Sequence, residues 1–265
     1  MVMIAQLKDP RKLKQHITQA VCQMYRQVSN NPNLGFHFPV GKKALLAVGY
    51  PKQLIDKLPG SATESFAGVG YHFQTDVIKP GMRVLDIGFG SGTDLLIASK
   101  LVGPAGQVVG IDITDAMIEK AKKAIASNGF GNTYVLKAEA DKLPFTAGTF
   151  DVVISNGVIN LVLNKRKAFS EIFRVLKKGG ILSFADIVLG KSISEESRQN
   201  PKLWAECVVG AMLEEQYLNL IKNAGFKNTQ IVQSLDYFTN SSSENTREVA
   251  KQYQAHTAVI KAVKP

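Results

Sequence analysis

From residue 83 onward, short apolar runs alternate with stretches whose apolar residues recur at helical spacing. A short run rich in Val, Ile and Leu is typical of a strand buried on both faces, and recurrence every three or four residues indicates an amphipathic helix. The predicted strands are residues 83–87, 107–112, 133–138, 151–156 and 181–189, and the predicted helices are residues 92–102, 114–129 and 166–180. This alternation predicts an α/β fold with a doubly wound, mostly parallel sheet and right-handed crossovers.

The C-terminal part of the chain departs from this alternation. Residues 229–238 and 256–263 form two further strand patterns, and the polar segment between them has room only for a short helix. Strands without a crossover helix pair antiparallel, so we expect an antiparallel pair at one edge of the sheet. The complete sheet is therefore predicted to have seven strands.

Residues 1–75 follow a different pattern. Apolar residues at helical spacing predict an amphipathic helix over residues 9–28, and residues 33–75 hold several glycines and prolines between apolar residues. We expect a string of short elements there that lies over the ligand crevice. The chain is accordingly divided into a helical N-terminal extension or lid, residues 1–75, and a ligand-binding domain, residues 76–265, with a substrate-side insertion near 190–213.

Composition narrows the class of protein. The chain has 265 residues, 45% of them hydrophobic, and a formal net charge of +10. Two cysteines are too few for a disulfide framework or an all-cysteine metal site, so a reducing, cytoplasmic location is expected and no metal site is predicted. The apolar runs are too short to span a membrane, and the first residues do not have the pattern of a signal peptide.

The positive charge is concentrated near the N-terminus. Residues 1–75 carry nine lysines or arginines against three acids, a bias that is compatible with a nucleic-acid partner or with a solvated helix face. Surfaces that bind single-stranded nucleic acid have aromatic residues between their basic residues, and this segment does not. The pattern therefore favours the solvated helix face.

The stretch VLDIGFGSGTD, residues 84–94, carries the first chemical information. Three glycines at alternate positions, Gly88, Gly90 and Gly92, follow a predicted strand that ends near Asp86. Glycines in the first strand-to-helix turn let the backbone approach a ligand closely, at the crevice where open α/β sheets bind ligands. Asp112 ends the next strand, where its carboxylate can accept hydrogen bonds from a ribose. The G-x-G-x-G spacing differs from that of dinucleotide sites, and no lysine of a P-loop follows, so a ribose-bearing ligand with little or no phosphate is predicted.

Together with AEADKLPF (138–145) and RVLKKGG (174–180), these motifs resemble those of class I S-adenosylmethionine-dependent methyltransferases. The resemblance covers about residues 70–235 and implies a Rossmann-like methyltransferase fold, with S-adenosyl-L-methionine as cofactor and S-adenosyl-L-homocysteine as product. By this resemblance the glycine loop faces the methionine end, Asp112 the ribose and Glu139 the adenine. The cofactor-binding residues it implies are Asp86, Ile87, Gly88, Phe89, Gly90, Ser91, Gly92, Asp94, Asp112, Ile113, Met117, Glu139, Ala140, Ser155, Asn156 and Gly157.

The segments SNGVINL (155–161) and WAECVVGAM (204–212) are similar to those of the arsenite methyltransferase family. Members of that family have SNCVINL, and many of them have another cysteine in a Gly-Cys-Gly turn. In that family, thiolates capture trivalent arsenic, a soft centre suited to soft ligands. Here Gly157 and Val69 stand at those two cysteine positions, and Cys207 is kept. The resemblance therefore implies a related scaffold that acts on a small molecule, with arsenite as one alternative acceptor. Two more functions stay open, an RNA-directed methyltransferase and a non-catalytic scaffold that binds the cofactor.

Several residues are candidates for the acceptor side. His37, Tyr71, His72 and Asn160 are the candidate catalytic residues, and Phe36, Trp204 and Cys207 are the candidate substrate-binding residues. Each histidine can act as a base or can be a hydrogen-bonded structural residue, and Asn160 can instead cap a turn. Trp204 and Cys207 have structural interpretations as well, as a core aromatic and a buried thiol. The identity of the acceptor atom, the use of a base and the oligomeric state stay open.

Overall fold

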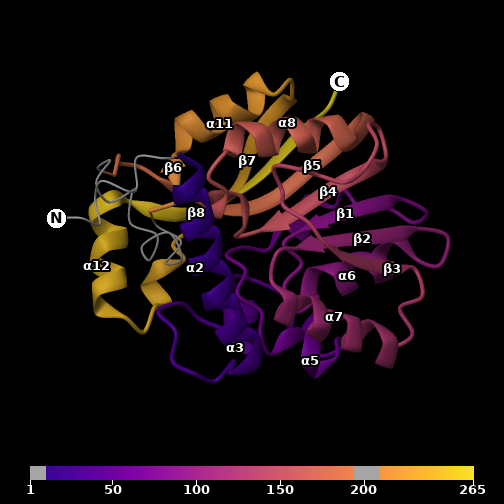
Figure 1. Cartoon of the computed structure of the whole chain (residues 1–265), viewed down its shortest axis with the longest axis horizontal. Coiled ribbons are helices and arrows are strands. Elements are labelled where there is room, and N and C mark those ends of the chain that lie inside the picture. Colours follow the sequence, from indigo (N-terminus) through magenta and orange to yellow (C-terminus); the bar gives the residue numbers. More distant parts are fainter. Residues whose placement is uncertain (1–9, 194–208) are drawn as a thin grey trace.

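The computed structural model describes residues 10–193 and 209–265, and its centre is an eight-stranded sheet with helices on both faces. Figure 1 shows α8 and α11 on one side of this sheet and α6 and α7 on the other. Seven strands follow the order β3-β2-β1-β4-β5-β8-β7. These strands are β1 (Arg83–Ile87), β2 (Gln107–Asp112), β3 (Thr133–Lys137), β4 (Phe150–Asn156), β5 (Leu176–Leu189), β7 (Lys227–Leu235) and β8 (Ala255–Val263). The doubly wound α/β prediction is confirmed.

The strand pairings match the predicted directions. Strands β1 to β5 pair parallel, whereas β8 lies antiparallel between β5 and β7, so the predicted antiparallel pair at one edge is also confirmed. The eighth strand, β6 (Met212–Leu213), pairs with the end of β5 and was not predicted. Two residues give no periodicity, so only the tertiary structure identifies this strand.

The helices of the C-terminal part cover the sheet with apolar faces. Helix α6 is buried on almost every side, because it packs beneath the first strands, and α7 is amphipathic with Met117, Ile118, Ala121 and Ala124 buried. These helices are α6 (Thr93–Val102), α7 (Asp115–Ser127), α8 (Lys165–Val175), α11 (Glu214–Asn223) and α12 (Glu244–Tyr253). Helix α12 occupies the polar segment where a short helix was expected.

The prediction of one helix over residues 166–180 was wrong at its end. Helix α8 stops at Val175, and Leu176 already pairs with Phe150 as the first residue of β5. Gly179 has a φ of +76°, a conformation that glycine adopts without strain and that a helix does not allow. The lysines of this segment are good helix formers, but the sheet hydrogen bonds determine its conformation.

The N-terminal segment begins with the long helix α2 (Pro10–Asn30), which crosses the end of the sheet toward which the parallel strands point (Figure 1). Its residues Ile17, Val21 and Val28 are buried, as the helical spacing predicted. Short elements follow, namely α3 (Lys42–Ala47), α4 (Lys52–Ile55), α5 (Gly60–Thr63) and η2 (His72–Thr75). None of the helices in the described residues combines the length and hydrophobicity that a bilayer crossing requires.

Asp186 of β5 is a fully buried acid that connects three elements. Its Oδ2 atom accepts hydrogen bonds from the backbone N of Asn160 (2.8 Å), in η3 (Ile159–Leu161), and from the Tyr217 hydroxyl (2.5 Å) in α11. Burial in the core raises the pKa of Asp186 to about 7. The carboxyl therefore holds the loop after β4 in place, and its ionisation in the folded protein is unfavourable.

This burial predicts a dependence of stability on pH. Because the pKa of Asp186 is higher in the folded than in the unfolded chain, the folded state binds more protons and the free energy of unfolding falls as pH rises from about 4 to about 7. Asp186→Asn keeps an oxygen acceptor but cannot ionise, so its unfolding free energy should change less with pH over this interval. Urea unfolding at about pH 5 and about pH 8 measures the difference. Equal pH dependence of the two proteins would contradict the prediction.

Candidate cofactor and acceptor site

The turn after β1 forms the floor of the site. Gly88, Gly90 and Gly92 have φ values of +75°, +55° and +99°, which side chains other than glycine rarely adopt. A Cβ atom at Gly88 would clash with the Val158 side chain, whereas one at Gly90 would meet no atom within 4 Å. Gly88 is therefore required by close packing, and the backbone at Gly90 is open to a ligand.

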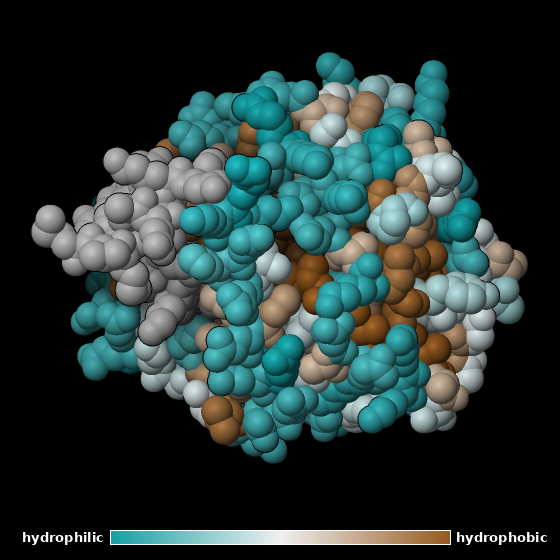
Figure 2. All heavy atoms as spheres, in the orientation of Figure 1, coloured by the Kyte–Doolittle hydropathy of each residue, from teal (hydrophilic) through white to brown (hydrophobic). Residues whose placement is uncertain are grey.

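A cavity of about 710 Å³, including the part open to solvent, lies above this turn. It continues into a second hollow beside Glu139 and Ala140, since both spaces are lined by Val21, Gly88 and Asp112. In Figure 2, apolar side chains are visible at the centre of this face between hydrophilic ones, beside α2. The cavity is thus elongated, with the glycine turn in the middle and acidic residues along its length.

Asp112, at the end of β2, fixes the shape of the turn. Its Oδ2 atom accepts a hydrogen bond from the backbone N of Gly90 (3.0 Å), and its Oδ1 atom accepts one from the backbone N of Thr114 (2.8 Å). Burial raises the pKa of this carboxyl, although the backbone donors oppose that effect. The carboxylate lines both parts of the cavity, where a ribose can reach it.

Asp86, near the end of β1, is buried and lines the same cavity. Among the described residues, its Oδ2 atom has no hydrogen-bond partner. Burial, followed by the nearby charges of Asp94 and Asp112, raises the pKa of Asp86 well above its ordinary value. A buried carboxylate oxygen without a donor indicates a missing ligand group that donates a hydrogen bond or carries positive charge.

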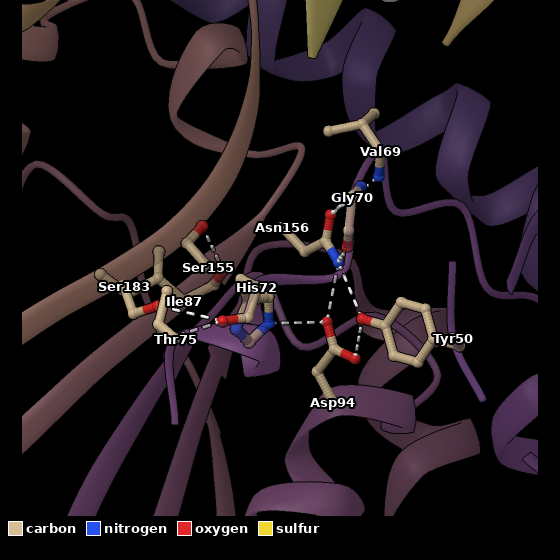
Figure 3. A network of polar contacts seen from close by, with 10 residues as sticks. All are labelled: Tyr50, Val69, Gly70, His72, Thr75, Ile87, Asp94, Ser155, Asn156 and Ser183. Atoms are coloured by element: carbon tan, nitrogen blue, oxygen red, sulfur yellow. Dashed lines mark hydrogen bonds and ion pairs between the residues drawn. The ribbon is translucent and has the colours of Figure 1, made fainter. Parts of the chain in front are cut away.

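Asp94, in the first turn of α6, is the centre of the network in Figure 3. The Tyr50 hydroxyl donates to Oδ1 (2.6 Å), the Asn156 amide donates to Oδ2 (3.0 Å), and the Nε2 atom of His72 lies 3.1 Å from Oδ2. Tyr50 is completely buried, and desolvation together with the Asp94 charge raises its pKa well above 10, so it donates as a neutral hydroxyl. Three side chains from separate segments therefore hold one carboxylate at the cavity wall.

Asn156, at the end of β4, connects this network to the N-terminal segment. Its Oδ1 atom accepts hydrogen bonds from the backbone N atoms of Val69 (2.8 Å) and Gly70 (3.3 Å), and its amide donates to the Gly70 carbonyl (2.9 Å). A Cβ atom at Gly68 would lie 2.6 Å from the Asn156 amide, so the turn at residues 68–70 needs glycine to pack this closely. The position of the turn is therefore set by the end of the sheet.

Helix α2 closes the other end of the cavity. Lys14 forms ion pairs with Glu139 (2.6 Å) and Asp141 (2.8 Å), across the hollow that the adenine-side residues line. At the C-terminal end of α2, Lys120 of α7 donates to the Ser29 carbonyl (2.8 Å). Both ends of α2 are thus attached to the part of the chain that forms the sheet and its helices. The Lys14 attachment is the more exposed of the two, with 39% of the Lys14 side chain accessible against 15% for Lys120.

Most of the residues predicted to bind the cofactor lie around the two hollows. Ser155 differs, because its hydroxyl donates to the Ile87 carbonyl (3.0 Å) and ties β4 to β1. The predicted residues that line the hollows are Asp86, Ile87, Gly88, Phe89, Gly90, Ser91, Asp94, Asp112, Ile113, Met117, Glu139, Ala140, Asn156 and Gly157. Gly92 begins α6 directly behind them.

The candidate acceptor-side residues are dispersed. Phe36 and His37 pack against Phe38, and their carbonyls accept hydrogen bonds from the loop before α12, so neither lines the cavity. Burial lowers the pKa of His37. Asn160 is fully buried, and its backbone N donates a hydrogen bond to Asp186.

Tyr71 and His72 line a separate hollow, and the His72 ring contacts Asp94. Trp204 and Cys207 fall outside the described residues. Of the candidate catalytic histidines, only His72 therefore contacts a residue of the cavity wall.

Sequence reasoning missed four residues that shape the site: Lys14, Tyr50, Thr114 as a backbone donor, and Val158. Lys14 was counted only as part of a basic N-terminal region, and Tyr50 lies 44 residues before its partner Asp94. Val158 directly follows the recognised SNG segment (155–157), and this adjacency was the one available signal. The other contacts are long-range and have no local pattern.

The strand order, the glycine turn and the acid at the end of β2 define the class I methyltransferase fold with an S-adenosylmethionine site. A family model described as a methyltransferase domain matches residues 78–225, more than half of the chain. The chain belongs to this methyltransferase domain family.

Two curated relatives and one solved structure show which methyltransferases this chain is similar to. An arsenite methyltransferase of Halobacterium salinarum is 36% identical over 58% of this chain and 39% of its own length. A ubiquinone/menaquinone biosynthesis C-methyltransferase of Vibrio parahaemolyticus is 30% identical over 57% of this chain and 67% of its own length. The crystal structure of an arsenic(III) S-adenosylmethionine methyltransferase from Chlamydomonas reinhardtii matches with a TM-score of 0.63 and 28% identity, covering 84% of this chain and 73% of that one. The chain spans about two fifths of the length of the first arsenite methyltransferases it matches.

The residues present fit S-adenosylmethionine. The cofactor carries a sulfonium and an ammonium, and the cavity offers three buried carboxylates, Asp86, Asp94 and Asp112. Buried charges need an opposite charge, so a cationic ligand stabilises this arrangement. The bare backbone at Gly90 gives the ligand room, and Asp112 can accept hydrogen bonds from its ribose.

The Lys14 ion pairs predict a measurable effect on cofactor release. Lys14→Ala should raise the dissociation rate of S-adenosylhomocysteine by roughly two- to fivefold, because a partly exposed ion pair contributes up to about 1 kcal/mol to keeping α2 closed. Surface plasmon resonance measures this rate. The control is Lys52→Ala, which removes the exposed Lys52–Asp56 pair on α4. The same dissociation rate for Lys14→Ala and for the unmodified protein would contradict the prediction.

Proposed function

We propose that this chain is an S-adenosylmethionine-dependent methyltransferase whose acceptor is a small organic molecule. The observation that carries the proposal is the contact between positions 69 and 157. A Cβ atom at Gly157 would lie 3.2 Å from the Val69 Cγ1 atom, so side chains at these two positions touch each other. By the resemblance to arsenite methyltransferases, many members of that family have cysteines at both positions, and here the pair is valine and glycine.

Thiols are scarce around the described cavity. Cys22, the one cysteine within residues 10–193 and 209–265, lies on α2 with its Sγ atom 3.7 Å from the Ile113 carbonyl and does not line the cavity. Burial raises the pKa of the Cys22 thiol, which reduces its thiolate fraction. Binding of arsenic by two adjacent thiolates, the soft ligands that it prefers, is therefore not supported at this wall of the cavity. An apolar contact surface for an organic acceptor is supported instead.

The residues of the site have distinct tasks in this proposal. Bound S-adenosylmethionine supplies an electrophilic methyl group on a sulfonium sulfur. Gly157 and Val158 follow β4 and line the cavity, and Gly157 has no side chain that would block an acceptor. Phe66 and Leu161 line the cavity with apolar side chains that limit the entry of water. The protein thus acts mainly by aligning the two reactants.

A small-molecule acceptor also agrees with the use of the N-terminal basic residues. Lys14 pairs with Glu139 and Asp141, and Lys52 pairs with Asp56, so part of the positive charge is neutralised within the fold. A surface that tracks phosphates would need these cations free for nucleic acid. RNA is therefore kept as an arm of the test and not as a second proposal.

The test is transfer of a labelled methyl group from S-adenosylmethionine in parallel reactions with a small-molecule metabolite extract, with arsenite plus a thiol, and with total RNA. The expected result is label in an organic small molecule. Label in methylated arsenic or in RNA would contradict the proposed acceptor, and no transfer in any arm would contradict the proposed activity.

A matched variant tests whether the missing thiols at positions 69 and 157 are the reason why arsenite is not the acceptor. The double substitution Val69→Cys with Gly157→Cys should introduce arsenite binding, measured as arsenic retained after desalting, because it places two thiols in contact. A side chain at the Gly157 φ of +70° is strained, so Val69→Cys alone, which keeps Gly157, is measured as well. Arsenite retention by the unmodified protein equal to that of the double variant would contradict the argument from missing thiols.

A further inference from the structure

A separate hollow, named here the Tyr71 hollow, shares no lining residue with either part of the cofactor cavity. Its volume is about 910 Å³, including the part open to solvent. Its walls come from α4 and the residues after it, from the segment around η2, from α6, and from β4 and β5 of the sheet. The apolar part of the lining includes Leu54, Tyr71, Phe73, Ile97, Leu101 and Ile154.

Several apolar side chains of the Tyr71 hollow stay accessible. Leu54, Tyr71 and Phe73 are half-buried, and Leu101 is 42% exposed. Single apolar residues on a convex surface are ordinary, whereas accessible apolar residues gathered in a concavity are typical of a ligand pocket. Pockets of this size hold small organic molecules. The hollow therefore offers contact for an apolar molecular body.

Two polar groups of the lining have hydrogens that the fold does not use. Within residues 10–193 and 209–265, the Lys57 ammonium and the Tyr71 hydroxyl have no hydrogen-bond or ion-pair partner. Burial, followed by the Asp94 charge, raises the pKa of Tyr71, so its hydroxyl is neutral and can donate. Asp76 also lines the hollow, but its carboxylate pairs with Lys79 (2.6 Å). The charge that the lining leaves available is therefore positive.

His72 separates the Tyr71 hollow from the cofactor cavity. Its Nε2 atom lies 3.1 Å from Asp94 Oδ2, and its carbonyl accepts a hydrogen bond from the Thr75 hydroxyl (2.9 Å), which also contacts the Ser183 hydroxyl (2.7 Å). Figure 3 shows His72 between Thr75 and Asp94. Asp94 lines the cavity, whereas the other three residues line the hollow. Two different ligands can therefore occupy the two spaces.

We propose that the Tyr71 hollow is a second ligand site, which binds a small organic acid with an apolar body. The apolar side chains contact the body, and Lys57 and Tyr71 donate to the acidic group, because a carboxylate or sulfonate accepts hydrogen bonds from an ammonium and from a neutral hydroxyl. The site lies outside the cofactor cavity, so the inference goes beyond the proposed function and does not rest on it.

Two fluorescent probes test the site. Anilinonaphthalene sulfonate has an apolar ring body and an anionic group, and phenylnaphthylamine has the same ring body without the anionic group. Fluorescence titration of the folded protein should show saturable binding of both probes, and this binding should persist with saturating S-adenosylhomocysteine. Displacement of the probes by S-adenosylhomocysteine would place them in the cofactor cavity and would overturn the inference, as would the absence of binding.

Lys57 tests the acidic group of the ligand. Lys57→Gln should weaken anilinonaphthalene sulfonate by roughly two- to fivefold, the effect of an exposed ion pair, and should leave phenylnaphthylamine unchanged. The matched control is Lys52→Gln, because Lys52 lies in α4, pairs with Asp56 and does not line the hollow. An equal change for both probes, or the same affinities as for Lys52→Gln, would overturn the assignment of an acidic ligand.

Leu101 tests the location of the site. Leu101→Glu replaces an apolar lining residue by a charged one and should weaken both probes by at least about threefold. Leu46→Glu is the control, since Leu46 is 53% exposed and does not line the hollow. Equal affinities for the two variants would overturn the location. If Leu101→Glu does not fold, the comparison of Lys57→Gln with Lys52→Gln decides. A failure of methyl transfer would contradict the proposed function and would leave these results unaffected.

Discussion

Three carboxylates buried around one cavity are the constraint on which the site depends. Asp86, Asp94 and Asp112 lie at or just beyond the carboxyl ends of β1 and β2, where a doubly wound sheet opens a crevice. Each is expensive to bury without donors. Asp112 accepts hydrogen bonds from the backbone N atoms of Gly90 and Thr114, Asp94 is held by side chains from distant segments, and Asp86 has one oxygen without a donor. The shape of the turn and the acidic lining of the cavity follow from these different partners of the three carboxyl groups.

The N-terminal segment is part of the site because it supplies hydrogen-bond and ion-pair partners for the carboxyl groups at the end of the sheet. The sheet ends in carboxylates and an amide, whereas Tyr50, His72 and Lys14 provide donors to them. Asn156 holds the turn at residues 68–70 through hydrogen bonds to its backbone, which do not involve the side chain at position 69. The same scaffold can therefore present a thiol or a valine toward the acceptor without a change in the surrounding hydrogen bonds.

The proposed function separates the residues that hold the cofactor from those that meet the acceptor. In the proposed function, backbone and carboxylates at the ends of β1 and β2 and in the glycine turn hold the cofactor, whereas positions 69 and 157 meet where two loops contact each other. In that proposal, changing these two residues would alter which atoms the acceptor meets. Similarity to arsenite methyltransferases and to a C-methyltransferase of quinone biosynthesis is compatible with one cofactor site and several acceptors.

The sequence by itself determined the features that repeat locally. Strand and helix periodicity gave the layered sheet and its antiparallel edge, and the spacing of Gly88, Gly90 and Gly92 before Asp112 gave the cofactor turn, because these features depend on neighbouring residues. Only the tertiary structure decided the end of α8 at Val175, where sheet pairing overrides helix propensity. It also decided which histidine reaches the site: His37 and His72 have similar glycine and aromatic neighbours in sequence, but only His72 meets Asp94. That choice depends on contacts across more than twenty residues of chain, which no local pattern encodes.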